Sequence, residues 1–372
     1  MVQFIDGNEA VVQGALASGC DFFAGYPITP ASSILIGMVE SLPGVGGIAV
    51  EGEDEIASIG FCIGAVMAGR RALTATSGPG LSLYSENVGL AIMGETPLVI
   101  VDVQRQGPAT GSATMGAQGD VQFVRWCTSG GYPTIALAPT SALECYLFTH
   151  RAFELAEECR TPVFLMLDKE LAQTRERVDL SEVPPLPPIV RRTAPADPKF
   201  RPYAFRDPSE VTPLSPLGGP NILRYTTSMH DQDGYLTKDR ETIQAMMEHL
   251  ERKILARADS FARVDVDGPE GAPLVFLSYG ISARSALAAA RQARERGTEV
   301  SVATVKTLWP VPERKIREAC RGAQTVVVVE QNLGDYAREI QRVLPGKDVR
   351  LARRMDGRLI PPSLVLKTAG IA

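Results

Sequence analysis

Short, almost continuous apolar runs that alternate with helical patterns constrain this chain more than any other feature. In the first half of the chain, these runs occupy 22–24, 72–76, 98–103, 134–138 and 163–167. The helical patterns among them cover 9–18, 34–41 and 56–68. Such runs are typical of parallel strands that helices bury on both faces. The sequence therefore predicts a doubly wound α/β domain over residues 1–182.

A second, smaller α/β unit follows a connector. Prolines crowd the stretch 183–220, which predicts an extended interdomain arm, and a helical pattern follows at 241–258. Further strands are predicted at 274–278, 299–305 and 325–330, with helices at 283–296 and 313–320. We expect two three-layer α/β domains, 1–182 and 266–372, joined by a Pro-rich arm and connector helix over 183–265.

Charge and composition disfavour several classes of partner. The net charge of −5 and the absence of a Lys/Arg block argue against nucleic acid and anionic membranes. No signal-like segment opens the sequence and no apolar run is long enough to span a bilayer, so we expect a cytoplasmic protein. The six cysteines form no C-x-x-C pair and the three histidines are far apart. We expect reduced thiols and no metal or iron–sulfur site in this chain.

The loop G-Y-P-I-T-P at 25–30 follows an apolar strand and precedes a helix. Its two prolines restrict the backbone, and Thr29 then offers a hydroxyl at the carboxyl end of a strand, where open α/β sheets bind ligands. The alternative is a well-made turn in which Ser32 or Ser33 caps the helix. Because turn motifs are common, spacing alone favours this structural explanation.

The acidic run E-G-E-D-E at 51–55 opens a helix. Acidic residues stabilise helix N-termini, which explains most of the cluster without a function. Glu55 is the exception, because it begins a helix whose inner face we expect to be small and apolar. The residues expected on that face are Ile56, Ala57, Ile59, Gly60, Ile63 and Gly64.

Two further loops follow strands of the same domain. T-S-G-P-G at 76–80 contains glycines that permit close approach to a ligand, although it lacks the lysine of a phosphate loop. V-D-V-Q-R at 101–105 delivers Arg105, whose guanidinium suits a carboxylate. An equally good explanation is a surface arginine paired with Asp102 or Asp120. The carboxyl ends of parallel strands share one edge, so we expect all four loops to meet there.

Five motifs, in their order and spacing, resemble the alpha-type subunit of 2-oxoacid:ferredoxin oxidoreductases. They are GYPITPASS, EGEDEIASIGFCIGA, ATSGPGLSL, IVDVQRQGPATG and QGD. The likeness continues through TTSMHDQDG, VVVVEQNLG and RRMDGRLIPP, and so covers nearly the whole chain. It implies a thiamine diphosphate pyrimidine-binding domain followed by a transketolase C-terminal-like domain. The implied reaction is coenzyme A-dependent oxidative decarboxylation of a 2-oxoacid, or the reverse carboxylation, with electrons passing to ferredoxin.

The resemblance also implies roles for individual residues. Glu55 resembles the glutamate that bonds N1′ of the aminopyrimidine, while Thr29 and Arg105 resemble the contacts to the substrate's carboxylate and carbonyl. The residues implied to line the cofactor pocket are Tyr26, Pro27, Ser77 and Gly78.

The resemblance implies that partners complete the site. The chain has no G-D-G motif with a spaced asparagine to hold magnesium and diphosphate, and no set of cysteines for a cluster. We therefore expect a beta-type subunit that shares the thiamine diphosphate, with gamma-type and ferredoxin-like subunits. Iron–sulfur clusters are expected in those partners only, and coenzyme A as a cosubstrate.

Several questions stay open at this stage. The stretch after Arg105 lacks a lysine that some relatives using 2-oxoglutarate carry, which disfavours 2-oxoglutarate without excluding it. A subunit of a non-oxidative thiamine diphosphate decarboxylase or a transketolase-like enzyme is the alternative function. A decayed assembly subunit is a third, although retention of Thr29, Glu55 and Arg105 argues against it. Some residues at strand ends of the second domain could contact coenzyme A or a neighbouring subunit, namely 279–282, Trp309 with Pro310, and Glu330 with Asn332. Ordinary packing and helix capping explain them equally well.

Overall fold

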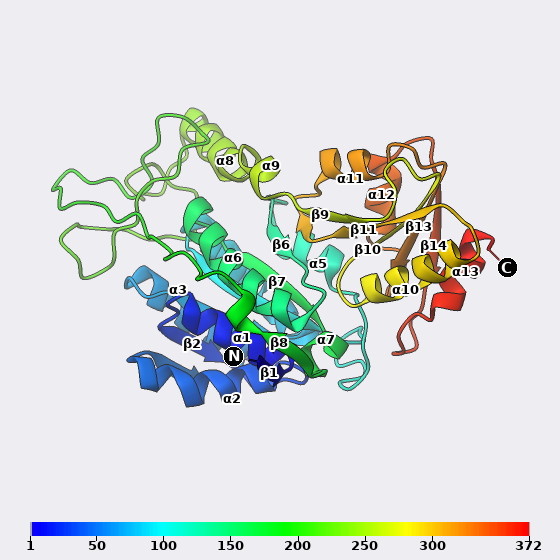
Figure 1. Ribbon diagram of the computed structural model, residues 1–372. Helices are drawn as coiled ribbons and strands as arrows, with labels where there is room; N and C mark the ends of the chain where they lie inside the picture. The colour runs from blue at the N-terminus through cyan, green and yellow to red at the C-terminus, as the bar shows by residue number, and fades with distance from the viewer. Residues whose placement is uncertain (1, 372) are drawn as a thin grey trace.

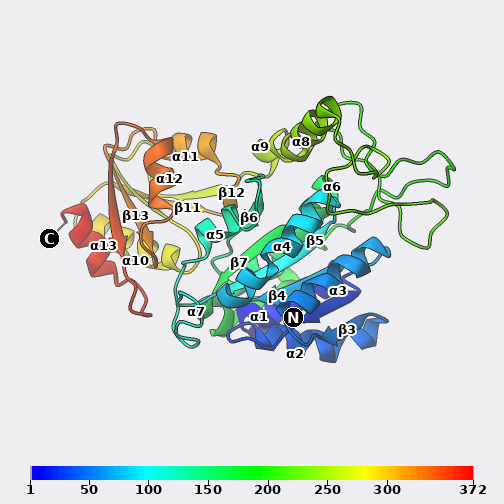
Figure 2. The same cartoon turned by 180° about the vertical axis from the view of Figure 1, so that it is seen from behind.

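Two helix-covered sheets lie side by side in the computed structural model, which describes residues 2–371 (Figure 1). The first sheet belongs to the N-terminal half of the chain and the second to the C-terminal third, and the view from behind shows the same arrangement (Figure 2). Among the described helices, none combines the length and apolar character required to cross a bilayer. All six cysteines are buried and unpaired within residues 2–371, as predicted.

The first sheet has the strand order β12-β6-β7-β5-β4-β2-β3. Its strands are β2 (Phe22–Gly25), β3 (Ile48–Glu51), β4 (Ala72–Thr76), β5 (Leu98–Gln104), β6 (Ile135–Leu137), β7 (Val163–Asp168) and β12 (Thr307–Trp309). The strands from β6 to β3 run parallel, and β12 joins the edge antiparallel to β6. The carboxyl ends of β3, β2, β4 and β5 therefore stand next to one another, as the sequence predicted.

Helices cover both faces of this sheet. On one face lie α1 (Gly7–Ala17), α2 (Ser32–Ser41), α6 (Ala142–Cys159) and α7 (Lys169–Gln173), with a 3₁₀ turn at Leu42–Val45. On the other face lie α3 (Glu55–Met67), α4 (Gly78–Met93) and α5 (Val121–Arg125). The strand β1 (Val2–Ile5) pairs antiparallel with β8 (Glu176–Asp179), and a 3₁₀ turn at Leu180–Glu182 follows.

The second sheet has the order β14-β13-β10-β11-β9 and is also covered on both faces. Its strands are β9 (Val264–Asp267), β10 (Leu274–Ser278), β11 (Val300–Val305), β13 (Thr325–Glu330) and β14 (Asp348–Arg353). The helices α10 (Ser282–Glu295) and α13 (Pro362–Ala369) pack on one face, and α11 (Glu313–Ala319) and α12 (Ala337–Val343) on the other. The predicted pair of three-layer α/β domains is confirmed.

The proline-rich stretch joins the two domains along the chain, as predicted, and it also packs on the first of them. It folds back over the first domain, where Arg191 pairs with Glu157 over 2.6 Å and the Leu217 N–H donates to the Met67 carbonyl oxygen over 2.8 Å. The chain then returns through α8 (Arg240–Leu255) and α9 (Ala258–Phe261), which lie above the first sheet in Figure 1. The arm is a cover for one end of the first domain.

Buried polar contacts join the two domains. The Trp309 indole N–H donates to the Val121 carbonyl oxygen over 2.9 Å, and β12 extends the first sheet. Gln118 lies at the centre of the boundary because its Oε1 accepts from the Ser282 hydroxyl over 2.8 Å and from the Gln331 N–H over 3.0 Å. The strand ends of the second domain therefore serve mainly the contact between domains.

Candidate active site

The loop after β2 places Thr29 at the carboxyl edge of the first sheet. Tyr26, Pro27 and Thr29 are exposed, whereas Pro30 is buried. Asn8 of α1 anchors the loop from beneath, because its Nδ2 donates to the Pro30 carbonyl oxygen over 2.8 Å. The three exposed side chains therefore stand on a backbone that is held in place.

The alternative explanation, in which Ser32 or Ser33 caps α2, is wrong. Ala31 is the N-cap of α2, and no side chain caps this helix in the described part of the chain. Ser33 Oγ instead accepts a hydrogen bond from Asn8 Nδ2 over 2.7 Å. The loop thus depends on α1 for its position, and its Thr29 hydroxyl is not used in capping.

Arg105 joins the loops that follow β2 and β5. Its Nη1 donates to the Thr29 carbonyl oxygen over 2.6 Å, and its Nη2 donates to the Thr110 carbonyl oxygen over 3.0 Å. The residue is only 7% exposed, and its buried Nε has no partner within residues 2–371. The alternative of a surface arginine paired with Asp102 or Asp120 is therefore wrong. A guanidinium has five N–H donors, so donors remain for a ligand.

Glu55 is the first residue of α3 and is 7% exposed. Asp54 caps the helix by accepting a hydrogen bond from the Ala57 N–H over 2.7 Å, so the structural explanation holds for Asp54. The Glu55 side chain lies beneath the start of α4, where a Cβ on Gly80 would fall 2.8 Å from Glu55 Oε1 and 2.1 Å from Thr76 Oγ1. Gly80 is what leaves room for this carboxylate.

The face of α3 that enters the core agrees with the prediction only in part. Ser58, Ile59, Cys62, Ile63 and Val66 are buried, in keeping with a helical period. The prediction is therefore confirmed for Ile59 and Ile63. It is wrong for Ile56 and Gly64, which are exposed, and Ile56 and Phe61 are 49% and 48% exposed on this outer side. The small residues thus belong to an outward-facing apolar surface beside Glu55.

Ser77 and Gly78 form the start of α4. Ser77 is the N-cap, but its hydroxyl caps nothing, and this fully buried oxygen lacks a partner among the described residues. Gly78 follows in close contact with Asp120, since a Cβ there would lie 3.0 Å from Asp120 Oδ1. The N-terminus of α4, with its partial positive charge, therefore points to the same edge as Thr29 and Arg105.

Two buried aspartates, Asp102 and Asp168, and the partly buried Asp120 were missed as site residues at this edge. The register pairs Thr76 with Asp102 and Gln104 with Asp168, so these side chains share the face of the sheet that carries α3 and α4. The Gln104 Oε1 in turn accepts from the Asp120 N–H over 3.3 Å. The available signal was an aspartate within the apolar run of β5, which was predicted only as an alternative partner of Arg105.

Burial dominates the protonation of these acids. It raises the pKa of Asp102 well above its usual range, with Asp120 and Asp168 adding to the effect. It raises the pKa of Asp120 to about 7 although Arg105 opposes the shift, and the pKa of Asp168 to about 7. Neither oxygen of Asp102 has a partner in residues 2–371. A fully buried carboxylate without a partner favours its neutral form.

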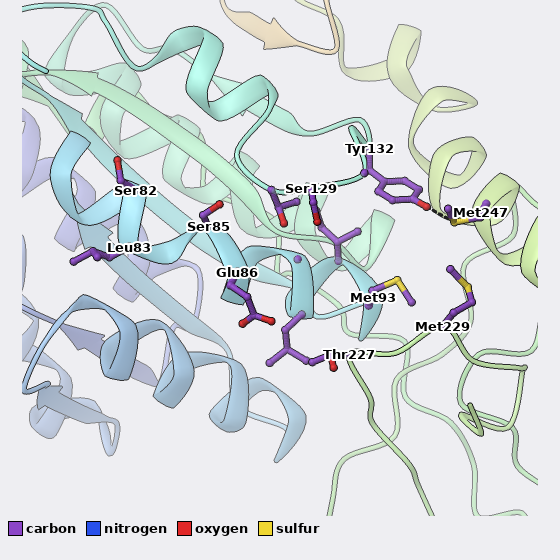
Figure 3. A pocket seen from close by; sticks show the side chains of 15 residues that line it. Ser82, Leu83, Ser85, Glu86, Met93, Ser129, Tyr132, Thr227, Met229 and Met247 are labelled. Carbon is purple, nitrogen blue, oxygen red and sulfur yellow. Dashed lines mark hydrogen bonds between the residues drawn. The ribbon is translucent and has the colours of Figure 1, made fainter. Parts of the chain in front are cut away.

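A cavity of about 610 Å³ lies farther along α4, away from this edge (Figure 3). Tyr132, Met229 and Met247 gather at one end of the cavity in Figure 3, and Ser82 and Leu83 lie at the other. Its lining residues in the described range include no lysine or arginine, so it does not suit the diphosphate of a cofactor. None of the residues predicted to form the site lines it.

Two family models match the chain. The model described as pyruvate flavodoxin/ferredoxin oxidoreductase, thiamine diphosphate-binding, matches residues 13–251, which is more than half of the chain. The chain belongs to this family. The model described as pyruvate:ferredoxin oxidoreductase core domain II matches residues 272–365 of the same oxidoreductase chain.

Relatives of this oxidoreductase chain match it almost from end to end. The 2-oxoglutarate synthase subunit KorA of Methanothermobacter marburgensis is 41% identical over 98% of this chain and 97% of the relative. The ketoisovalerate oxidoreductase subunit VorB of the same organism is 34% identical over 96% and 94%. Subunit alpha of 2-oxoacid:ferredoxin oxidoreductase 2 from Aeropyrum pernix is 34% identical over 88% of this chain but 54% of the relative.

Solved structures agree with this assignment. A 2-oxoglutarate:ferredoxin oxidoreductase from Magnetococcus marinus, solved with 2-oxoglutarate, coenzyme A and succinyl-CoA bound, matches with a TM-score of 0.91 and 29% identity. The match covers 99% of this chain and 65% of that one. A split-gene transketolase, 12% identical with a TM-score of 0.56, shares the fold. The resemblance read from the motifs is confirmed, and with it the class of ferredoxin-linked oxidoreductase subunits.

Proposed function

We propose that this chain is the alpha-type subunit of a 2-oxoglutarate:ferredoxin oxidoreductase. It would take part in coenzyme A-dependent oxidative decarboxylation, or the reverse carboxylation, with electrons exchanged with ferredoxin. One observation carries the proposal, namely that Thr29, Glu55, Ser77 and Arg105 meet at one edge of the first sheet with donors and acceptors left unused. Names of the relatives supply the substrate class.

The residues present fit thiamine diphosphate. The Ser77 hydroxyl is buried and unpartnered within the described chain, and Gly80 leaves a place for the Glu55 carboxylate. Bound there, the cofactor supplies a carbon centre that takes up the electron pair released on decarboxylation. Glu55 would hold a proton at N1′ of the aminopyrimidine, while Tyr26, Pro27 and Gly78 would line the pocket.

Arg105 and Thr29 suit the 2-oxoacid itself. The free guanidinium donors of Arg105 can bond a carboxylate, and the exposed Thr29 hydroxyl lies on the loop that Arg105 holds. Because the same guanidinium fixes the loop and faces the substrate, the two groups would be oriented together.

2-Oxoglutarate is proposed as the substrate although the missing lysine after Arg105 disfavoured it. The relatives named as 2-oxoglutarate synthase subunits are 39–41% identical, whereas those named for ketoisovalerate are 34% identical. The second domain also contacts the loop after Arg105. Gln106 Nε2 donates to the Met355 carbonyl oxygen over 2.8 Å, and Gly357 packs against Met115. We propose that the exposed Arg358 on this loop faces the second carboxylate of 2-oxoglutarate.

Partner subunits would complete the enzyme. The named relatives are subunits of ferredoxin-linked enzymes, and the outer apolar surface of α3 beside Glu55 supports a partner that covers it. We assign magnesium and diphosphate binding to a beta-type subunit, and iron–sulfur clusters to gamma-type and ferredoxin-like partners. We also propose a cytoplasmic location, where six unpaired thiols remain reduced. We also propose that residues 1–182 and 266–372 form the two domains and that residues 183–265 connect them.

Co-purification at native expression levels tests this function. We expect a partner with cluster-binding cysteines and thiamine-dependent reduction of ferredoxin by 2-oxoglutarate with coenzyme A. Reduction by branched-chain 2-oxoacids alone would overturn the substrate proposal and keep the family. A thiamine-dependent partner without clusters would favour the non-oxidative alternative, and no such partner would favour a decayed assembly subunit.

A further inference from the structure

Two side chains hold the loop that carries Thr29, and they bond to consecutive carbonyl groups. Arg105 Nη1 donates to the Thr29 carbonyl oxygen over 2.6 Å, and Asn8 Nδ2 donates to the Pro30 carbonyl oxygen over 2.8 Å. Pro30 is buried, whereas Thr29 is exposed. The place of the Thr29 side chain is therefore set by bonds to the backbone around it. The proposed chemistry gives a role to Arg105 but none to Asn8.

The partners of Asn8 determine how its amide group is turned. A carbonyl oxygen can only accept hydrogen bonds, so the amide nitrogen rather than the amide oxygen must face Pro30. The same nitrogen donates its second hydrogen to Ser33 Oγ, 2.7 Å away at the start of α2. Asn8 itself is fully buried in the first turn of α1. It thus uses both of its donors to tie the end of the loop and the first turn of α2 to α1.

Stability alone does not explain this asparagine. Its Oδ1 is buried without a partner among residues 2–371, and an unpaired buried acceptor destabilises a fold. Asn221 in the arm provides the comparison, because its Nδ2 likewise donates to a proline carbonyl oxygen and to a serine hydroxyl, those of Pro195 and Ser215, both over 3.0 Å. The Asn221 Oδ1, however, accepts from the Asp197 N–H over 2.8 Å. Asn221 is satisfied within the chain, whereas Asn8 holds its loop with one atom unsatisfied.

The helix that carries Asn8 shares a base with the loop that follows β5. At Gly7 a Cβ would fall 2.6 Å from the Leu171 carbonyl oxygen, so α1 begins directly against α7. Glu170 of α7 also packs against Gly116, where the carboxylate leaves no room for a Cβ. Both loops of the proposed 2-oxoacid contact therefore stand on α7, and Asn8 is the link on the side of α1.

We propose that Asn8 is a positioning residue that sets the place of the Thr29 hydroxyl relative to Arg105 and thereby supports binding of the 2-oxoacid. Asn8 lies beneath the loop and acts through Thr29 rather than on the substrate. Without its amide, the buried Pro30 carbonyl oxygen loses its donor and the loop shifts to find another, while the bond from Arg105 to the Thr29 carbonyl oxygen remains. This inference rests on the proposed contact between Thr29 and the 2-oxoacid.

Steady-state kinetics of the complex with its partner subunits test this role. Asn8→Leu removes both donors and keeps the number of side-chain atoms. We expect the Km for 2-oxoglutarate in ferredoxin reduction to rise about tenfold, because a small displacement of a positioned group weakens binding by such a factor. The turnover number and the Km for coenzyme A should stay within about twofold, since a contact that is equal in the bound state and in the transition state affects only the Km of its own substrate.

Two further variants separate positioning from stability. Asn221→Leu removes the matching pair of donors in the arm, so it should lower the melting temperature by a similar amount but keep the Km for 2-oxoglutarate within about twofold. In a Thr29→Ala background, Asn8→Leu should add less than about a twofold change in Km, because the group that it positions is absent. Asn8→Asp, which keeps the shape and loses the donors when ionised, provides the same test if Asn8→Leu does not assemble.

The outcomes that overturn the inference differ from those that overturn the function. If Thr29→Ala raises the Km for 2-oxoglutarate but the Asn8 variants leave it unchanged, the positioning role falls and the Thr29 contact stands. The same conclusion follows if Asn8→Leu raises the Km equally with and without the Thr29 hydroxyl. If Thr29→Ala leaves the Km unchanged, the proposed contact of Thr29 falls, and the role of Asn8 falls with it.

Discussion

Glu55 and Glu330 are buried carboxylates near the ends of parallel strands, yet their surroundings differ completely. Glu330 ends β13 and accepts hydrogen bonds from the Tyr279 hydroxyl, the Asn332 amide and the backbone N–H groups of Tyr336 and Ala337, over 2.9–3.1 Å. Glu55 follows β3 and has no ion pair or hydrogen bond to its carboxylate within residues 2–371.

The same contrast extends to their neighbours. Beside Glu55, the Ser77 hydroxyl and the Arg105 Nε are buried without partners among the described residues. Beside Glu330, the Ser278 hydroxyl donates to the Val329 carbonyl oxygen over 2.7 Å, and Asn332 bonds three acceptors. Similar topology therefore serves two purposes. Groups satisfied within the chain stabilise the fold, and buried groups left unsatisfied are available to a ligand.

The largest effect is expected for Glu55→Gln, which changes the proton acceptor but hardly the shape. The rate should fall about 10³-fold, within the range for loss of a general acid or base, while the melting temperature stays unchanged. Hydrogen–deuterium exchange at the thiazolium carbon in the assembled complex measures this step directly. Glu53→Gln, at an exposed acid of the same segment, is the matched control and should exchange at the wild-type rate. Undiminished exchange in Glu55→Gln would remove the residue from the proposed role.

Glu330→Ala should show the opposite behaviour. Four donors would lose their acceptor in a buried place, and the free energy of unfolding should fall by about 3 kcal/mol. Urea unfolding measures the loss, and the Km for the 2-oxoacid should stay within about twofold in the folded complex. Glu318→Ala, at an exposed helix position, should change stability by less than about 0.5 kcal/mol. Equal stability of Glu330→Ala and Glu318→Ala would contradict the structural role of Glu330, and with it the difference drawn between the two strand ends.

Much of the site was predictable because it depends on local order along the chain. Parallel strands place their carboxyl ends at one edge, so the loops carrying Thr29, Glu55 and Arg105 had to meet there once the strands were recognised. Strands β10 and β13 have the predicted bounds for the same reason, since a buried strand is a continuous apolar run.

The remaining features depend on contacts between distant parts of the chain. The β12 strand pairs with β6 across about half of the sequence, and the arm packs on the first domain through residues such as Arg191 that show no pattern. Burial of Asp102 depends on the register of β5, and the contact of Asp120 with Gly78 depends on the approach of α4. The predicted inner face of α3 was right for Ile59 and Ile63 and wrong for Ile56 and Gly64, because small and apolar residues suit an outer surface as well as a core.

Arg105→Ala tests whether the unsatisfied groups at the edge of the first sheet bind the substrate. Loss of hydrogen bonds to a charged group should raise the Km for the 2-oxoacid about 10- to 100-fold. The Km for coenzyme A should change by less than about twofold, because only the 2-oxoacid is proposed to meet the guanidinium. Arg105→Lys should recover part of the loss at most, since one ammonium cannot bond both the Thr29 carbonyl oxygen and a carboxylate in the same geometry. Equal effects on both substrates would remove Arg105 from the carboxylate contact.

The smallest effect is expected where the second domain reaches the site. Arg358 is exposed on the loop that packs against Gln106 and Met115, so a bond to the second carboxylate of 2-oxoglutarate would be shared with water. Arg358→Ala should therefore raise the Km for 2-oxoglutarate only about tenfold, which corresponds to about 1.4 kcal/mol, and leave the Km for 2-oxobutyrate unchanged. Arg314→Ala, at an exposed arginine of α11, should affect neither substrate. A parallel rise for both 2-oxoacids would show that Arg358 holds the loop rather than the substrate, and the second domain would then contribute stability alone.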